Sequence, residues 1–171
     1  YGEEDPRAWA ASEIKGGSPG EIDAIIPHPW SGVVINEYLA HTDDPVLDFI
    51  ELHNQANISL DISGCFLTDD RGTNKFKIPA NTTIPARGFV SFDQNLTDFS
   101  LDAGGETIYL VAADGSRVLD ALRFGGQENG VSTGRSPDGS GTIHRLASPT
   151  PGAANVPRRV ESVVINEIMY H

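Results

Sequence analysis

Turn-forming residues divide most of this chain into short segments, and this division limits the folds that the chain can adopt. The sequence has 18 Gly and 11 Pro, and nowhere do apolar residues recur at i, i+3, i+4 and i+7 over a long window, as an amphipathic helix requires. Between the turns lie short runs rich in β-branched and aromatic residues, such as residues 88–92. We therefore expect about eight to ten short strands between residues 33 and 155, with no crossover helix, as in a β-sandwich or barrel.

Four of these strand positions can be stated closely. Two strands are expected at residues 33–40 and 47–54, and in the second of them both alternating faces carry apolar and polar side chains. That alternation therefore does not indicate which face is buried. Residues 106–111 and 117–122 bracket Asp114-Gly115, and Asp-Gly between two such runs is a strong hairpin signal.

A five-residue sequence occurs twice in the chain. Val33-Val34-Ile35-Asn36-Glu37 returns unchanged at residues 163–167, an offset of 130 positions (163 − 33), which is about the size of one small domain. Gly17-Ser18-Pro19-Gly20 and Pro149-Thr150-Pro151-Gly152 fit nearly the same period. We divide the chain accordingly: residues 1–31 are the end of a preceding unit or an extended connector, 32–155 are one β-sandwich unit, and 156–171 are a linker with the first strand of a following unit.

Five motifs, taken in their order along the chain, resemble the lamin tail domain, and in particular its bacterial, exported branch, whose units begin with Val-Ile-Asn-Glu. Two further motifs resemble the closing strand and exit of that family. The motifs stand at residues 34–37, 48–54, 60–67, 76–79 and 84–90, followed by 134–139 and 149–155. Phe49 and Cys65 depart from the Trp that the family often has at these places, but both keep an apolar side chain there.

The resemblance implies an all-β fold, an immunoglobulin-like β-sandwich of about eight to ten short strands. To this we add an extended N-terminal connector and a C-terminal extra strand. Members of this kind are accessory modules of secreted or cell-surface proteins and have no chemistry of their own. The expected location is therefore secreted or cell surface, although a fold by itself does not determine a function.

Charge and composition exclude some partners. The net charge is −12, from 24 acidic and 12 basic residues, which argues against a nucleic-acid surface, because phosphates bind Lys and Arg. No apolar run approaches the roughly 18 residues of a membrane span. Cys65 is the single cysteine, so no internal disulfide can form, and its apolar neighbours predict a buried position.

One group of acidic residues is a candidate metal site. The side chains of Asp43, Asp44, Asp48 and Glu51 could supply oxygen ligands for Ca²⁺, although no EF-hand spacing is present. The alternative is that these residues are charges at strand edges, or half-buried carboxylates that accept N–H groups from loops. We expect no other cofactor.

No sequence motif indicates catalysis. Neither Gly-x-Ser-x-Gly nor His-Glu-x-x-His occurs, so we expect no catalytic residues and no enzyme. Two functions stay open: a repeated structural or adhesion module that serves as a scaffold or spacer, or a module that binds a carbohydrate or protein ligand beside an attached extracellular enzyme. Most Phe and Tyr residues lie in expected strands, which favours the scaffold.

The second copy of the repeated sequence is a candidate interface. An unpaired apolar strand tends to pair with another sheet, so a strand at the end of the chain could add to an edge of a neighbouring copy and produce a head-to-tail array. The alternative is that this strand begins a further unit of a longer polypeptide. The residues of the predicted interface are Val163, Val164, Ile165, Asn166, Glu167 and Ile168.

Overall fold

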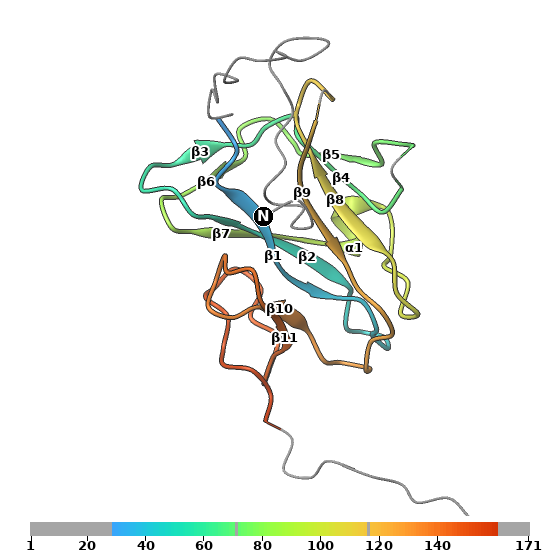
Figure 1. Cartoon of the computed structure of the whole chain (residues 1–171). Helices are drawn as coiled ribbons and strands as arrows, with labels where there is room; N and C mark the ends of the chain where they lie inside the picture. Colours follow the sequence, from blue (N-terminus) through green and yellow to red (C-terminus); the bar gives the residue numbers. More distant parts are fainter. Residues whose placement is uncertain (1–28, 71, 116, 161–171) are drawn as a thin grey trace, which may run out of the picture.

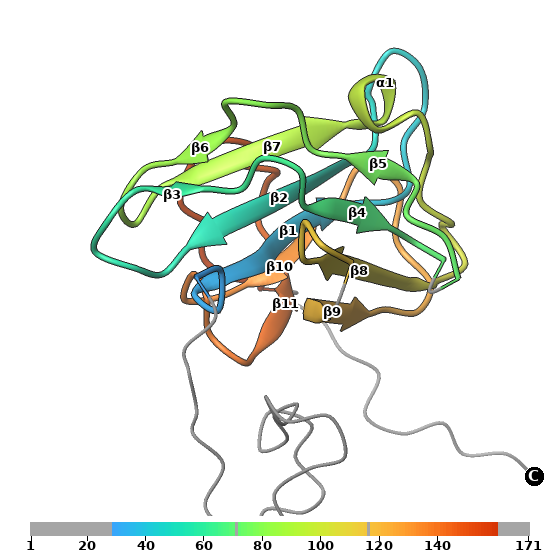
Figure 2. The same cartoon turned by 90° about the horizontal axis from the view of Figure 1, so that it is seen from above.

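The computed structural model describes residues 29–160 except residues 71 and 116. Its largest sheet has the strand order β11-β10-β1-β2-β7, and all neighbours in it are antiparallel (Figures 1 and 2). The strands of this five-stranded sheet are β1 (Val33–Leu39), β2 (Phe49–Asn54), β7 (Phe89–Asp93), β10 (Thr133–Arg135) and β11 (Ile143–Arg145).

A second sheet, with the strand order β5-β4-β8-β9, packs against the first, and a two-stranded ladder β3-β6 lies beside them. The remaining strands are β3 (Leu60–Asp61), β4 (Phe66–Thr68), β5 (Phe76–Lys77), β6 (Thr83–Ile84), β8 (Thr107–Val111) and β9 (Val118–Arg123). A short helix, α1 (Gln94–Thr97), follows β7 directly. Within the described residues this makes eleven strands and confirms the expected all-β sandwich of short strands.

The hydrophobic core lies between the two sheets. The larger sheet contributes Ile35, Ile50 and Leu52, and the smaller sheet contributes side chains such as Leu67 and Ile108, all at or near full burial. Burying a side chain of this size stabilises a fold by about 1.5–3 kcal/mol. The aliphatic and aromatic content of the strands is therefore what joins the sheets into one domain.

A β-bulge in β1 changes which side chains point into this core. Ile35 pairs with Leu52, but the next pair is Glu37 with Glu51, so Asn36 is an additional residue on β1. Because of this insertion, Ile35 and Tyr38 both face the core while the two polar residues between them face away. On β2, Glu51 lies between Ile50 and Leu52, two core residues, and therefore also faces away from the core.

The local predictions are largely confirmed. β8 and β9 form the expected hairpin around Asp114-Gly115, in which Gly115 has φ +69° and its N–H donates to the Ala112 carbonyl at 2.8 Å. Cys65 is fully buried. The strand expected at 47–54 begins at Phe49, because the Asp48 backbone N–H donates to the Gln94 side chain instead of a ladder. Every residue of β2 is buried, so the sheet is covered on both faces.

One element of the structure was not expected, and two predicted segments lie mostly or wholly outside the described residues. Helix α1 was not expected; it begins because the Asp93 side chain accepts the N–H groups of Asn95 and Leu96. A membrane-spanning helix is absent from the part of the chain that the structure describes, where α1 has four residues. Most of the expected connector (1–31) and the C-terminal extra strand lie outside the described residues.

Candidate functional site

The last described part of the chain lies on the outer face of the five-stranded sheet, on the side away from the core. We call residues 147–157 the exit segment, and Glu37 with Glu51 the glutamate pair. In Figure 2 the red exit segment is seen behind β2 and β7, on the far side from β4 and β8. Both glutamate side chains point to this outer face, and both are 0% exposed.

The carboxylates of the glutamate pair bind the exit segment mainly through backbone N–H groups of that segment. The Glu37 carboxylate accepts the Thr150 N–H at 3.0 and 3.1 Å and the Thr150 hydroxyl at 2.8 Å. The Glu51 carboxylate accepts the Gly152 N–H at 2.6 Å. Hydrogen bonds to an ionised acceptor are stronger than neutral ones. Pro151 lies between the two donor residues and has no N–H to satisfy.

Amide and carboxylate side chains extend this network around the bulge. Asn36 donates through its side-chain nitrogen to Glu51 Oε1 at 3.2 Å and to Asp138 Oδ1 at 2.9 Å, and its Oδ1 accepts the Gly139 N–H at 3.0 Å. From the exit segment, the Asn155 N–H donates to the same Asp138 oxygen at 3.0 Å. The bulge residue therefore connects β2, the β10–β11 loop and the exit segment.

The Asn155 side chain satisfies backbone carbonyls near the bulge. Its Nδ2 donates to the Asn36 carbonyl at 3.2 Å and to the Arg135 carbonyl at 2.7 Å. Beyond this point the chain adds to the edge of β11, where Leu146 and Arg158 form an isolated bridge and the Arg159 N–H donates to the Arg145 carbonyl at 2.7 Å. The exit segment is therefore held at both of its ends as well as at its centre.

The surroundings of the glutamate pair disfavour the ionisation of both carboxyl groups at the same time. Glu37 and Glu51 are directly paired across β1 and β2, an arrangement in which like charges repel. Among the described residues neither of them forms an ion pair. Burial raises the pKa of Glu37 above its ordinary value, against the hydrogen bonds from Thr150. Burial, with smaller contributions from the negative charges of Glu37 and Asp138, raises the pKa of Glu51 to about 7, against the hydrogen bonds from Asn36 and Gly152.

The four predicted calcium ligands are not brought together. Asp43 accepts a hydrogen bond from the Asn129 side chain, and Asp48 accepts the Thr42 hydroxyl at 2.9 Å and the Leu101 N–H at 3.1 Å. Over residues 29–160, with 71 and 116 left aside, no group of three or more His, Cys, Asp or Glu side chains could hold a metal ion. Asp48 and Glu51 instead accept loop N–H groups, the alternative role weighed from the sequence. Calcium binding stays a prediction.

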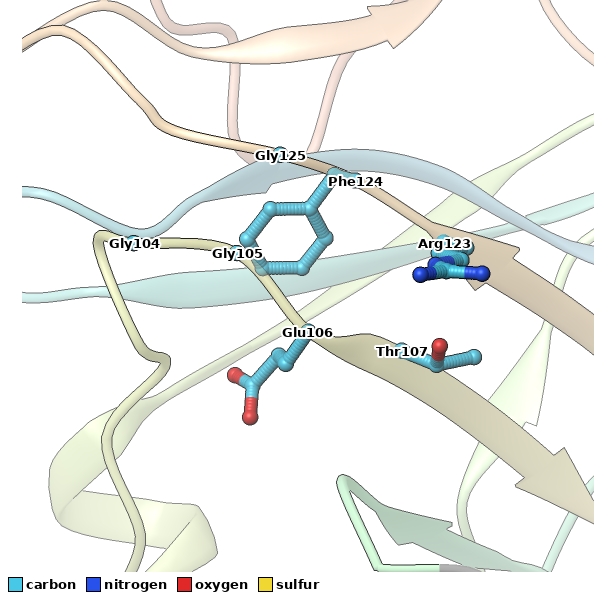
Figure 3. A pocket seen from close by; sticks show the side chains of 7 residues that line it. All are labelled: Gly104, Gly105, Glu106, Thr107, Arg123, Phe124 and Gly125. Carbon is cyan, nitrogen blue, oxygen red and sulfur yellow. The ribbon is translucent and has the colours of Figure 1, made fainter.

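Two open depressions could admit small molecules. One, of about 590 Å³, lies where β8 begins and β9 ends, and Figure 3 shows its lining: Gly104, Gly105, Glu106, Thr107, Arg123, Phe124 and Gly125. The other, of about 270 Å³, is mostly polar, and two of the predicted calcium ligands, Asp44 and Asp48, line it.

The larger depression offers little specific chemistry. Phe124 is 9% exposed, and its ring stacks on Tyr38 with 4.4 Å between the ring centroids, so it belongs mainly to the core. The Glu106 carboxylate accepts the Asp102 N–H at 2.8 Å, and burial raises its pKa. Arg123 is exposed. The residues that line this depression supply one carboxylate, one guanidinium and one hydroxyl group, and they include no His, Cys or Lys.

Sequence reasoning missed most of the network around the glutamate pair. In the sequence, Thr150, Gly152, Asn155 and Asp138 belong only to motifs, and Glu37 only to a motif and the repeated five-residue sequence. The signal was present, since the motifs at 34–37, 48–54, 134–139 and 149–155 are the ones that meet here. The predicted interface at 163–168 lies outside the described residues.

The comparisons with known proteins gave one match. The family model described as Lamin Tail Domain matches residues 27–126. No curated protein and no solved structure matched the chain. The match includes both members of the glutamate pair and ends before β10, but β10 pairs with β1 in the middle of the sheet, so the folded unit continues beyond the matched range.

Proposed function

Because this chain belongs to the lamin tail domain family, whose members are immunoglobulin-like modules, we propose that it is a non-catalytic structural or adhesion module of a secreted or cell-surface protein. In this role it acts as a repeated scaffold or spacer between neighbouring domains or copies of itself. Residues 163–168, of which the first five repeat residues 33–37 of β1, provide the contact with the next unit.

The attachment of the exit segment is the observation that carries this proposal. A spacer transmits a defined direction from one unit to the next, and this requires that the chain leave the domain along a fixed path. Here Thr150 and Gly152 are bound to the glutamate pair, and Arg159 is bound along the edge of β11. Burying two carboxylates costs free energy, and here both of them bind the exit segment. Their position therefore supports a mechanical role for this segment.

The exposed surface also favours a scaffold over a carbohydrate-binding module. Sugar recognition usually requires an exposed aromatic platform. In the described part of the chain, the exposed large hydrophobic side chains are all aliphatic: Val46, Ile58, Leu96, Val118, Ile143 and Val160. They come from separate strands and loops.

The depression beside Gly105 supports the second candidate function, the binding of a ligand next to an attached enzyme. Three of its lining residues are glycines, and Glu106 and Arg123 offer one charge of each sign. A glycan and peptide array decides between the two functions. Consistent hits that Arg123→Ala abolishes would establish the binding role. An array without hits would favour the scaffold role.

The scaffold is tested by joining two copies of the 171-residue chain, end to start, and measuring small-angle X-ray scattering. We expect a fixed separation between the two domains, visible as a distinct second maximum in the pair-distance distribution. Replacing both members of the glutamate pair with Ala in the first copy should broaden that maximum, while Glu106→Gln in the first copy should not. A broad distribution in the unmodified tandem would contradict a spacer.

The contact through residues 163–168 needs its own test. The single chain and a variant without residues 160–171 are compared by light scattering over a range of concentrations. Self-association that depends on these residues is the expected result. Assembly that is the same with and without them would remove the terminal strand from the proposal.

A further inference from the structure

The exit segment meets the glutamate pair with hydrogen-bond donors alone. Residues 147–157 contain no Asp, Glu, His, Lys or Arg, so the segment supplies N–H and O–H groups but no countercharge. Glu37 and Glu51 are directly opposite each other and fully buried beneath it. Removing two like charges from water without a cation is unfavourable. A proton on one carboxyl group relieves this cost.

The charged groups closest to the pair do not supply the missing cation. Asp138, from the β10–β11 loop, adds a further negative charge. Arg135, on β10, donates to the carbonyl oxygens of Ile35 and Ser140, and its guanidinium forms an ion pair with Asp120 of β9 at 2.9 Å. The positive charge of Arg135 is therefore already neutralised by another carboxylate.

The remaining neighbours are uncharged or turned to other partners. On β7, the residue paired with Glu51 is Ser91. His53, two residues along β2, stacks on Phe89 and has its Nδ1 3.0 Å from the Gly88 carbonyl oxygen. On β11, His144 is paired with Gly134, so β10 lies between it and β1.

We propose that the contact between the exit segment and the glutamate pair responds to pH: it is closed when one of the two glutamates holds a proton, and it opens more readily when both are ionised. Lifting the segment would let water reach the carboxylates and stabilise their charged form. The pKa of Glu51, about 7 against an ordinary 4.5, agrees with this geometry, because the closed state binds the proton more tightly than a solvated glutamate does.

The direction and size of the response follow from this difference in proton binding. Below about pH 4.5 the proton is present in both states, and the open-to-closed ratio does not depend on Glu51. Between about pH 4.5 and 7 the ratio rises by up to tenfold per pH unit, and above 7 it levels off. If opening restores full solvation, the ratio increases up to about 300-fold over this range.

Amide hydrogen exchange measures this opening at the two donors themselves. Protection factors of the Thr150 and Gly152 amides are followed from about pH 5 to about pH 8, each corrected for the intrinsic exchange rate at that pH. We expect protection to fall by about 100-fold. The Ile78 amide, which donates to the Cys65 carbonyl at 2.8 Å within the core, is the internal reference and should change little. Protection at Thr150 and Gly152 that is constant or rises with pH would overturn the proposal.

Two variants test whether Glu51 causes the pH dependence of amide exchange. Glu51→Gln cannot ionise, so the pH dependence at Thr150 and Gly152 should disappear. Glu106→Gln is the matched control, because burial also raises the pKa of Glu106 but this residue is bound to the Asp102 N–H at the start of β8. It should leave the response intact. An equal response in Glu51→Gln and in the wild type would show that another group is responsible, and the wild-type series decides the question even if a variant fails to fold.

The use of this response by a scaffold rests on the structural role proposed above. The exchange experiment does not, since it is made on the single chain. If amide exchange in the exit segment depends on pH but scattering shows a flexible tandem, only the spacer role is contradicted. If the tandem is rigid but amide exchange does not depend on pH, only the pH response is contradicted.

Discussion

The glycine of β10 that faces the bulge gives the sharpest test of how the exit segment is attached. Gly134 is paired with Glu37, and a Cβ at this position would lie 2.6 Å from Asn155 Nδ2, 2.8 Å from the Asn36 carbonyl oxygen and 3.0 Å from Leu146 Cδ1. Separations under 3.0 Å essentially never occur for a Cβ. In Gly134→Ala the Asn155 side chain must therefore leave its place, or β10 must move away from β1.

The cost has two parts. Asn155 Nδ2 donates to the carbonyl oxygens of Asn36 at 3.2 Å and of Arg135 at 2.7 Å, and each lost hydrogen bond costs about 0.5–1.5 kcal/mol. Crowding in a packed site adds about 1–3 kcal/mol. The free energy of unfolding of Gly134→Ala should therefore fall by about 3 kcal/mol, which corresponds to about 10 °C in Tm for a domain of this size.

Urea unfolding and thermal melting at a fixed pH measure this loss. Gly126→Ala is the matched control, because nothing lies within 4 Å of a Cβ there and its φ is not positive. The control should remain within about 1 kcal/mol of the wild type. If Gly134→Ala is as stable as Gly126→Ala, Asn155 does not hold the exit segment as described, and the reasoning fails at this point.

Three further predictions concern stability. The pKa of Glu51 is raised from 4.5 to about 7 in the folded state, so the stabilisation by protonated Glu51 is complete below about pH 4.5 and is lost as the pH rises through 7, a loss of about 3 kcal/mol. Melting temperatures measured in pH steps should show this loss, and the Glu51→Gln variant should show a flatter pH dependence. Asn54→Ala removes a buried amide that donates to the Ile58 and Pro85 carbonyls at 2.8 and 2.9 Å and accepts the Ala56 N–H at 2.9 Å. The free energy of unfolding in urea should fall by about 3 kcal/mol, and a loss under 1 kcal/mol would contradict the role of Asn54 in closing the loop after β2. Calcium binding at the four predicted ligands should raise Tm when Ca²⁺ is added, and an unchanged Tm removes that prediction.

Local patterns predicted much of the fold. The hairpin around Asp114-Gly115 and the burial of Cys65 depend on neighbouring residues, and both were found as expected. The start of the second strand was misplaced by two residues, because the Asp48 N–H binds the Gln94 side chain and the Asp48 carboxylate binds the Leu101 N–H, both from distant parts of the chain. Nothing near Asp48 in the sequence indicates these partners.

The candidate site was predicted in pieces. The acidic residues were seen as a group because they are close in sequence, but the structure uses them separately: Asp48 holds a loop, while Glu51 belongs with Glu37. The pairing of the two glutamates depends on the bulge at Asn36. A bulge shifts the register of a strand by one residue, and in the sequence it has no mark beyond two polar residues within an apolar run.

By itself, the sequence determined the all-β class, the positions of the main strands along the chain and the family, because turn residues, alternation and motif order are local or linear properties of a chain. Only the tertiary structure decided which carboxylates are buried together and what they bind. The donors to Glu37 come from Thr150, 113 positions further along the chain, and only the folded sheets bring the two residues together. Burial and the pKa of a carboxyl group depend on what covers it in space, and here the cover is a segment without any charge.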